Sequence, residues 1–500
     1  EHLAKRPFEA AAAEILAAID AGAGVPADLA TGLITLLEET IWRLVEHEVE
    51  TSFPVRKLWI TLELVTAFGL GLGRLILRGD PVRSLDALEL TAWLDANAVL
   101  GKLTKVTRES GPLRMVYELV FAFEGGDSSK PNLAAGVAVV GLTRLVLRYV
   151  GNITYDLAAG MGECAIVPYY EAIRARAPQT EFHFFHRVRA LVPSSDGTRI
   201  ERVRIGVQAT TNGSPYAPLK SVAGIRCFGE KPDYHQLAQG EALRGSDALV
   251  PAIPAPALGE ITAPRAAASP RWKDMLANVT GVPTRAMQLW MTETTEALGG
   301  WRARSGSAEP PLVGSYVDDL GTIDDMSHVS ATERWPKHAT PQSSVYSCGT
   351  LPPPADLPPG CDTPVPGLMR RVREAATRYG VEWTKANIAH LFPGLVVNGA
   401  IDWSKLADPG GGAGEARLLA QYFRGNVSAS ERYVTSFAGS IGSRLRPDAL
   451  TFSNLLLAGD WTDNGMNAGA LEAAVTSGRI AARKLLGASY LLWGENETLL

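Results

Sequence analysis

One stretch constrains the fold of this 500-residue chain more than any other: LLLAGDWTDNGMNAGALEAAVTSGRIAARKLLG, at residues 455–487. It predicts an apolar strand, NLLLAG, then a turn rich in Gly and Asn, and then a long helix of small residues. Ligands of α/β sheets bind outside the carboxyl ends of strands, so Asp460 would lie at such a crevice. Gly465 and Gly469 would permit tight turns and close backbone approach. As spacing alone, the pattern fits ordinary α/β scaffolding equally well.

Length and composition limit the class of protein. A chain of 53.4 kDa exceeds one ordinary core, so two or three lobes are expected. The hydrophobic fraction of 46% and the charged fraction of 20% are those of a globular protein. The net charge of −5 gives no reason to expect nucleic acid as a partner. The cysteines form no CxxC and no Cys/His cluster at zinc spacing, so we expect neither a metal site nor a disulfide framework. They are Cys164, Cys227, Cys348 and Cys361.

The first residue is Glu rather than Met, so we expect the native start to lie elsewhere, and a removed signal peptide is compatible with that. The most apolar window, residues 58–77, contains Glu63 and Arg74. Central charges favour a buried or interfacial helix over a membrane span, so no transmembrane segment is expected. The sequence leaves the compartment open, with the cytoplasm favoured.

Periodicity divides the chain into four segments. Residues 1–155 read as helical, with Ala/Leu/Glu-rich runs at helical spacing. Residues 156–270 contain a glycine turn and helix, then the strand TEFHFFHRVRALV with RIERVRIGVQAT as its hairpin partner across Ser-Asp-Gly. Mixed strands and helices fill residues 271–452, and the strand-turn-helix occupies residues 453–500.

The last segment resembles a known signature. AGDWTDNGMNAGALEAAVTSGRIAARKL is similar, nearly end to end, to the C-terminal flavin-binding signature of the FAD-dependent amine oxidase and phytoene desaturase superfamily. Its Gly-Asp-Trp-Thr variant is closest to the carotenoid desaturase and squalene-processing branch. One departure is LEAAV, where many relatives have Glu-Gly-Ala-Val. The resemblance implies FAD as the cofactor, with Asp460 approaching its ribityl-pyrophosphate region. The helix start near Ala470 and Leu471 would present N–H groups to the N1/O2 edge of the flavin.

The resemblance continues upstream. YDLAAGMGECAIVPYYEAIRAR followed by FHFFHRVRALV is similar to the middle FAD segment of the superfamily, in which a strand backbone meets the adenine. That match assigns Val188 to the adenine. The implied fold is an α/β, FAD/NAD(P)-binding, Rossmann-like flavoprotein with a mixed-sheet substrate domain and a helical cap. The positions assigned to the cofactor are Gly459, Asp460, Trp461, Gly469, Ala470, Leu471 and Val188.

One element of the superfamily is missing. A GxGxxG turn between a first strand and a helix should cradle the pyrophosphate. The nearest candidate, FGLGLGRLILRGD, follows a helical stretch, and we interpret Gly69, Gly71 and Gly73 as a helix packing face. The first βαβ unit is therefore missing from this chain. We expect a second polypeptide to carry it, with this chain as the C-terminal part of a cleaved or split enzyme.

The expected reaction is removal of a hydride from a C–H bond of a small-molecule substrate, with the flavin as acceptor. The catalytic residues stay unknown, with Trp461, Arg424 and Tyr422 as candidates. An L-amino-acid oxidase that releases peroxide needs an aromatic cage and a cation for the carboxylate, and Arg424 could clamp it or form a surface ion pair. Additional candidates are Trp290, Arg444 and Arg446, while Trp290 and Trp403 are more typical of a core.

The alternative enzyme is an isoprenoid or carotenoid-type desaturase with a long apolar tunnel, over which the helical first 150 residues would suit a lid. The signature favours this desaturase, whereas the two-chain argument favours the oxidase. A third alternative is a non-catalytic scaffold of the same fold. His186 is interpreted as a strand residue beside the adenine rather than a base, and His183, on the opposite face of the strand, has no stronger claim to a catalytic role. Asp463 and Asn464 are either polar pocket groups or turn formers.

Overall fold

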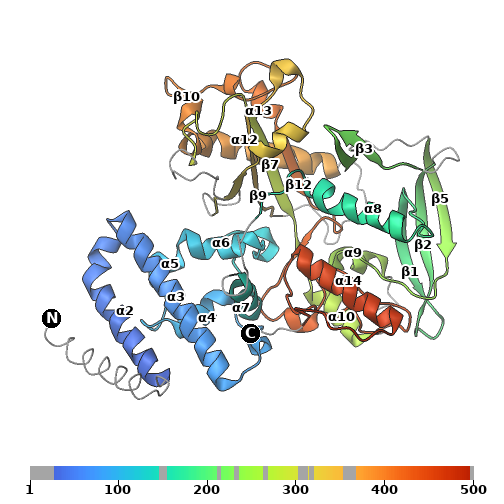
Figure 1. The fold of residues 1–500 in the computed structure, drawn as a ribbon, viewed down its shortest axis with the longest axis horizontal. Coiled ribbons are helices and arrows are strands. Elements are labelled where there is room, and N and C mark those ends of the chain that lie inside the picture. Colours follow the sequence, from blue (N-terminus) through green and yellow to red (C-terminus); the bar gives the residue numbers. More distant parts are fainter. Residues whose placement is uncertain are drawn as a thin grey trace.

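The computed structural model describes residues 27–145, 155–210, 216–229, 236–262, 269–301, 313–314, 320–352 and 368–495 (Figure 1). A helical lobe lies on one side of the molecule and the strands lie on the other. The last helix, α14 (Leu471–Leu486), runs between the helical lobe and a three-stranded sheet. Cys361 lies outside the described residues.

The helical lobe is built on a hairpin of two long helices, α2 (Ala27–Val49) and α3 (Phe53–Arg78). Helix α3 has Pro54 in its first turn and ends at Gly79, which adopts a left-handed φ of 66°. Proline there loses no intrahelical bond, and glycine takes that conformation without strain. The remaining elements of the lobe are η1 (Val82–Leu85), α4 (Leu90–Asn97), α5 (Lys105–Arg108), α6 (Gly111–Leu119), η2 (Glu124–Gly126) and α7 (Ala135–Thr143).

The glycine-spaced segment is helical, as predicted. Gly69, Gly71 and Gly73 all lie inside α3, so they form no phosphate-binding loop. A Cβ on Gly71 would come within 2.4 Å of the Trp93 indole, so this glycine lets α4 pack closely against α3. Gly69 and Gly73 have open space at the same position. Only the middle glycine therefore serves helix packing.

Helix α3 is also the helix, among the described residues, whose length and apolar composition would allow it to cross a membrane. Apolar core helices and signal sequences have the same two properties. Only 28% of its most apolar window is buried, so much of α3 faces outward. Large apolar side chains are exposed along it, among them Leu58, Val65 and Leu77.

The middle segment folds largely as predicted. A π-helical turn, η4 (Gly162–Ile166), leads into α8 (Val167–Arg176). The strands β1 (His186–Pro193) and β2 (Ile200–Thr210) pair antiparallel as the expected hairpin, and β5 (Gln236–Arg244) pairs with the far side of β2. A smaller hairpin joins β3 (Leu219–Val222) and β4 (Ile225–Phe228).

A four-stranded antiparallel sheet in the order β12-β7-β9-β8 forms a separate lobe. Burial alternates strictly along β7 (Thr284–Met291), because one face of the sheet packs on a core that includes Met287, Leu289 and Phe392. The other strands are β8 (Thr322–Asp325), β9 (Ser343–Thr350) and β12 (Tyr422–Asn426), and α12 (Leu368–Leu391) packs against β12. Short elements complete the described chain: α9 (Ala255–Ile261), α10 (Pro270–Asn278), β6 (Gly281–Val282), β10 (Val396–Val397), β11 (Ala400–Ile401), α13 (Ala416–Leu419) and β13 (Tyr433–Val434).

The predicted strand NLLLAG is not a strand in the structure. Leu455 forms one isolated parallel bridge with Leu249, extended by the bond from the Leu456 N–H to the Leu249 C=O. Leu455, Leu456 and Leu457 are nonetheless buried, as the prediction required. The described strands pair antiparallel, so within these ranges no parallel sheet exists for the segment to join.

Candidate functional site

The start of α14 is open. Its N-cap residue, Ala470, has extended backbone (φ −151°, ψ 151°) and offers no capping side chain. The first helical bond runs from the Ala474 N–H to the Ala470 C=O, so the amides of residues 471–473 have no intrahelical acceptor. Leu471, at the first helical position, is 47% exposed. These amides and the helix dipole make a site that favours negative charge.

A buried hydroxyl ties the end of the extended segment to the side of α14. Ser477 Oγ accepts a hydrogen bond from the Gly459 N–H at 3.0 Å and lies 2.8 Å from Thr462 Oγ1. Thr462 Oγ1 donates to the Gly459 C=O at 2.8 Å, so Ser477 donates to Thr462. Gly459 has φ 145°, which only glycine adopts readily, and its missing Cβ makes room for the Trp461 indole. The turn is thereby fixed relative to the helix.

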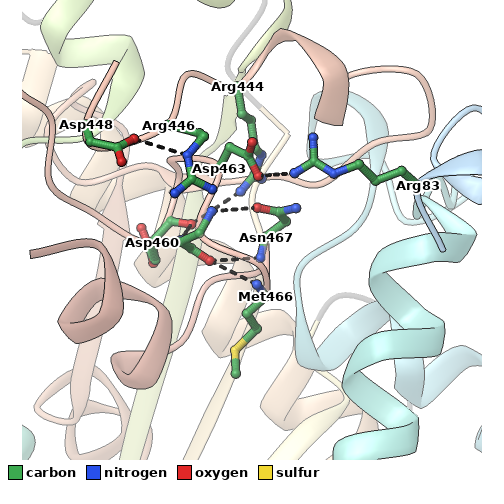
Figure 2. A network of polar contacts seen from close by, with 9 residues as sticks. Arg83, Arg444, Arg446, Asp448, Asp460, Asp463, Met466 and Asn467 are labelled. Carbon is green, nitrogen blue, oxygen red and sulfur yellow. Dashed lines mark hydrogen bonds and ion pairs between the residues drawn. The ribbon is translucent and has the colours of Figure 1, made fainter. Parts of the chain in front are cut away.

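Two asparagines, Asn464 and Asn467, hold the turn itself, and Figure 2 labels Asn467. Asn464 Oδ1 accepts bonds from the N–H groups of Met466 and Asn467, and its amide donates to the Asp460 C=O at 3.0 Å. Asn467, at a left-handed φ of 57°, accepts the Asn464 N–H through Oδ1. Both side chains are buried. These contacts show Asn464 in the second of its two predicted roles, that of a turn former.

Asp463 has a role that the sequence did not reveal. Its carboxylate lies 2.5 Å from the Arg83 guanidinium, which comes from η1 of the helical lobe 380 residues away. The Asp463 side chain is nearly buried and Arg83 is half exposed. This ion pair fastens the helical lobe to the turn that precedes α14 (Figure 2).

Arg444 lies beneath the turn and is fully buried. Its guanidinium donates to the C=O groups of Thr435 and Asp460 and to the Ser436 hydroxyl, at 3.0, 3.3 and 2.9 Å. Burial lowers its pKa to about 10, and the neighbouring carboxylates, chiefly that of Asp460, oppose the shift. It therefore stays charged at neutral pH and serves as a structural cation, not as the exposed substrate clamp that the sequence allowed.

Asp460 holds its carboxylate at the edge of this network. Burial raises its pKa, while the charge of Arg444 opposes the rise. Arg444 donates to the backbone carbonyl of Asp460, and no salt bridge to the Asp460 carboxylate exists among the described residues. The carboxylate remains able to accept hydrogen bonds from ligand hydroxyl groups.

Gly469 leaves no room for a side chain, because the Tyr433 ring packs directly against its backbone. A Cβ there would lie 2.3 Å from the ring of Tyr433, whose hydroxyl donates to the Gly469 C=O at 3.3 Å. Burial raises the pKa of Tyr433, so its phenol is neutral. The uncapped helix start, the Asp460 carboxylate and this close backbone approach fit the flavin-edge segment that the signature implies.

The backbone of Val188 faces the edge of β1 that lies away from β2. Gln208 N–H donates to the Phe185 C=O at 2.7 Å, which sets the phase of the β1–β2 ladder. Bonded and non-bonded pairs alternate in antiparallel sheets, so the N–H and C=O of Val188 point away from β2. Among the described strands, β1 has β2 as its neighbour, and its other edge is open. The adenine contact itself stays a prediction.

The catalytic candidates do not gather at the start of α14. Trp461 is only 2% exposed and packs in the core with Trp272 and Phe452, so a catalytic or cage role is not supported. Arg424, on β12, bonds to Asn426 at 2.7 Å and to Glu431 at 2.6 Å, the surface ion pair that the sequence also allowed. Tyr422, at the start of β12, is 44% exposed.

The remaining candidates are also engaged elsewhere. Arg446 pairs with Asp448 at 3.1 Å. Trp290 donates to Glu333 at 2.8 Å, and Trp403 packs at the border of a hydrophobic core. His183 lies 3.1 Å from Glu181 at the surface, and the ring of His186 contacts the Phe184 C=O at 2.5 Å. Sequence reasoning missed Arg83, Ser477 and Tyr433, because their contacts join residues that are distant in the sequence or, for Ser477, join the helix to the turn before it.

Comparisons with known proteins show a similarity in the C-terminal part of the chain. Residues 420–486 match the model of the flavin-containing amine oxidoreductases. A comparison with curated proteins gave no match. Among solved structures, an oxidoreductase from Methanosarcina mazei is similar at 9% identity, with 83% of this chain and 72% of that chain covered and a TM-score of 0.43. The family match spans β12, the turn and α14, so this part of the chain is similar to the flavin-containing amine oxidoreductases, a similarity that implies FAD as the cofactor.

Proposed function

We propose that this chain is part of an FAD-dependent oxidoreductase that removes a hydride from a substrate C–H bond. The observation that carries the proposal is the uncapped start of α14, which lies inside the family match and directly follows the Asp460 turn. FAD, when bound, supplies the hydride acceptor. The amides of residues 471–473 would stabilise negative charge at the flavin edge, because they are already oriented before any charge develops. Asp460 would bind a hydroxyl of the ribityl chain.

One substitution tests the role of the α14 amides. Leu471→Pro removes the N–H at the first helical position, where proline is tolerated in a helix and where Ala470 already has the extended backbone that precedes proline. Leu471→Ala keeps the N–H and is the matched control. We expect Leu471→Pro to make the flavin harder to reduce. A lost donor of about 1–3 kcal/mol corresponds to roughly 20–65 mV for a two-electron couple. Equal flavin potentials in the two variants would contradict the assignment.

We further propose that the pyrophosphate cradle comes from a second polypeptide, with this chain as the C-terminal part of a cleaved or split enzyme. Three observations support this. The first strand among the described residues is β1, at His186; the edge of β1 at Val188 is open; and the segment at Leu455 has a strand neighbour on one side only. Mass spectrometry of the purified flavoprotein should find a partner with a GxGxxG segment. Stoichiometric FAD on this chain alone would defeat the proposal.

For the substrate, we favour the apolar, desaturase-type reading over an amino-acid oxidase. The candidate cations for a substrate carboxylate are already engaged: Arg424 with Glu431, Arg446 with Asp448, and Arg444 inside the core. Incubation of the flavoprotein with a panel of amino acids and amines should therefore release no peroxide. Peroxide release would establish the oxidase instead. Absence of a flavin absorption band from the purified complex would favour a non-catalytic scaffold.

A further inference from the structure

A large apolar cavity lies inside the helical lobe, between α3, α4, α6 and α7. Its volume is about 380 Å³, which is within the range of small-molecule sites and far above the space that one water needs. Leu64, Phe68 and Leu72 of α3 form one wall. Leu94 of α4 and Val116 of α6 contribute to the others. With one exception the lining side chains carry no polar group, so water gains little there and an apolar ligand gains burial.

The exception is Thr143, at the end of α7. It is 1% exposed, and its hydroxyl has no hydrogen-bond partner among the described residues. Helical threonines ordinarily donate back to the carbonyl four residues earlier, as Thr40, Thr66 and Thr384 do in this chain. A buried hydroxyl that makes no bond costs free energy unless something else supplies the partner. Thr143 is thus a single unsatisfied polar group lining an apolar site.

The cavity communicates with the surface along α3. Val65 lines the cavity and is 64% exposed, so the apolar lining continues onto the outer face of the helix. The outward positions from Leu58 to Gly73 on α3 carry no charged side chain, and the one acid in this span, Glu63, is buried. A hydrocarbon chain could enter there without passing a charged group.

We propose that this cavity binds a molecule with one hydrocarbon chain and one hydrogen-bonding end group, such as a long-chain alcohol or prenol, with the end group bonded to Thr143 Oγ1. The chain would fill the space between α3, α4 and α6, and the end group would satisfy the Thr143 hydroxyl, which has no partner among the described residues. The site lies in the helical lobe and requires no flavin. The inference therefore does not rest on the proposed oxidoreductase function.

Calorimetric titration with 1-decanol, and competition by n-decane, tests the site on the whole protein. Wild type should bind decanol more tightly than decane, because only decanol bonds to Thr143. Thr143→Val keeps the shape and removes the hydroxyl, so it should lose about 3- to 12-fold in decanol affinity and leave decane affinity unchanged. Thr40→Val is the control, because that hydroxyl donates to the Leu36 C=O and does not line the cavity.

A second variant tests the cavity itself. Val116→Trp places a large ring in the space, so both ligands should lose binding while circular dichroism keeps its helical signal. Val116 is only partly buried, which leaves room for that ring to be accommodated. No decanol binding by folded wild type would overturn the proposal. Equal decanol affinities in wild type and Thr143→Val, or undiminished binding in Val116→Trp, would also overturn it.

Discussion

A buried carboxylate in the helical hairpin gives the sharpest prediction about stability. Glu38, on α2, is 1% exposed, and neither of its carboxylate oxygens has a hydrogen-bond partner among the described residues. Burial raises its pKa from 4.5 to about 7; the nearby Thr66 hydroxyl opposes the rise and the charge of Glu63 adds to it. The folded hairpin therefore holds the proton more tightly than the unfolded chain does.

The sign and the size follow from linkage. The stability that the protonated carboxyl gives is fully present below about pH 4.5 and is lost as the pH rises to about 7. At about 1.4 kcal/mol for each pH unit, the loss amounts to about 3 kcal/mol. Glu38→Gln has no proton to lose, so its free energy of unfolding should not show this decline. The gap between variant and wild type should widen by about 3 kcal/mol from pH 4.5 to pH 8.

Urea unfolding at a series of pH values, followed by far-UV circular dichroism, measures this gap. Glu39→Gln is the matched control, since Glu39 is partly exposed and lies 3.7 Å from Arg43 at the surface. That control should follow the wild-type pH curve. If Glu38→Gln also follows it, the carboxylate is not held in the buried state described here.

Three other substitutions test the site. Gly469→Ala should destabilise the protein by about 1–3 kcal/mol and weaken flavin retention, because the new Cβ meets the Tyr433 ring. Its control, Gly73→Ala, has open space inside α3 and should stabilise the protein by about 0.5–1 kcal/mol. Thermal melts compare the two variants. Arg444→Met should lower the free energy of unfolding by about 3–5 kcal/mol, because buried acceptors and Asp460 lose their cation. Arg424→Gln, which breaks a surface ion pair, should lower it by under about 1 kcal/mol in the same denaturation series. Ser477→Ala should lower the free energy of unfolding by about 1–3 kcal/mol, because the Gly459 N–H loses its acceptor. An equal loss in the neighbouring variant Thr476→Ala would refute this explanation.

Local patterns predicted the elements that depend on local forces. The β1–β2 hairpin followed from alternation and a Ser-Asp-Gly turn, and α14 followed from its apolar stripe and the glycine at 487. The strand expected at NLLLAG failed because a strand depends on a continuous ladder with its neighbours, and Leu455 forms only isolated bridges, a parallel one with Leu249 and an antiparallel one with Phe452. Burial of these leucines was nevertheless predictable from their composition.

The site was predictable only where one motif carries it. The turn at Asp460 and the helix start at Ala470 are read from consecutive residues, so their arrangement could be foreseen. The Arg83–Asp463 ion pair joins residues 380 positions apart, and no local pattern marks either one. Trp461 looked like a pocket residue beside Asp460, but its indole turns into the core over Gly459, whose missing side chain makes the room.

The open edge of β1 has a consequence for handling the isolated chain. Backbone donors and acceptors along an uncovered strand are a template to which a strand of another molecule can add. Val188 turns its amide and carbonyl towards that edge, and β1 has no second neighbour within the described sheet. By covering this edge, the cofactor and the partner would prevent self-association. The isolated chain should form strand-linked oligomers whose size increases with protein concentration.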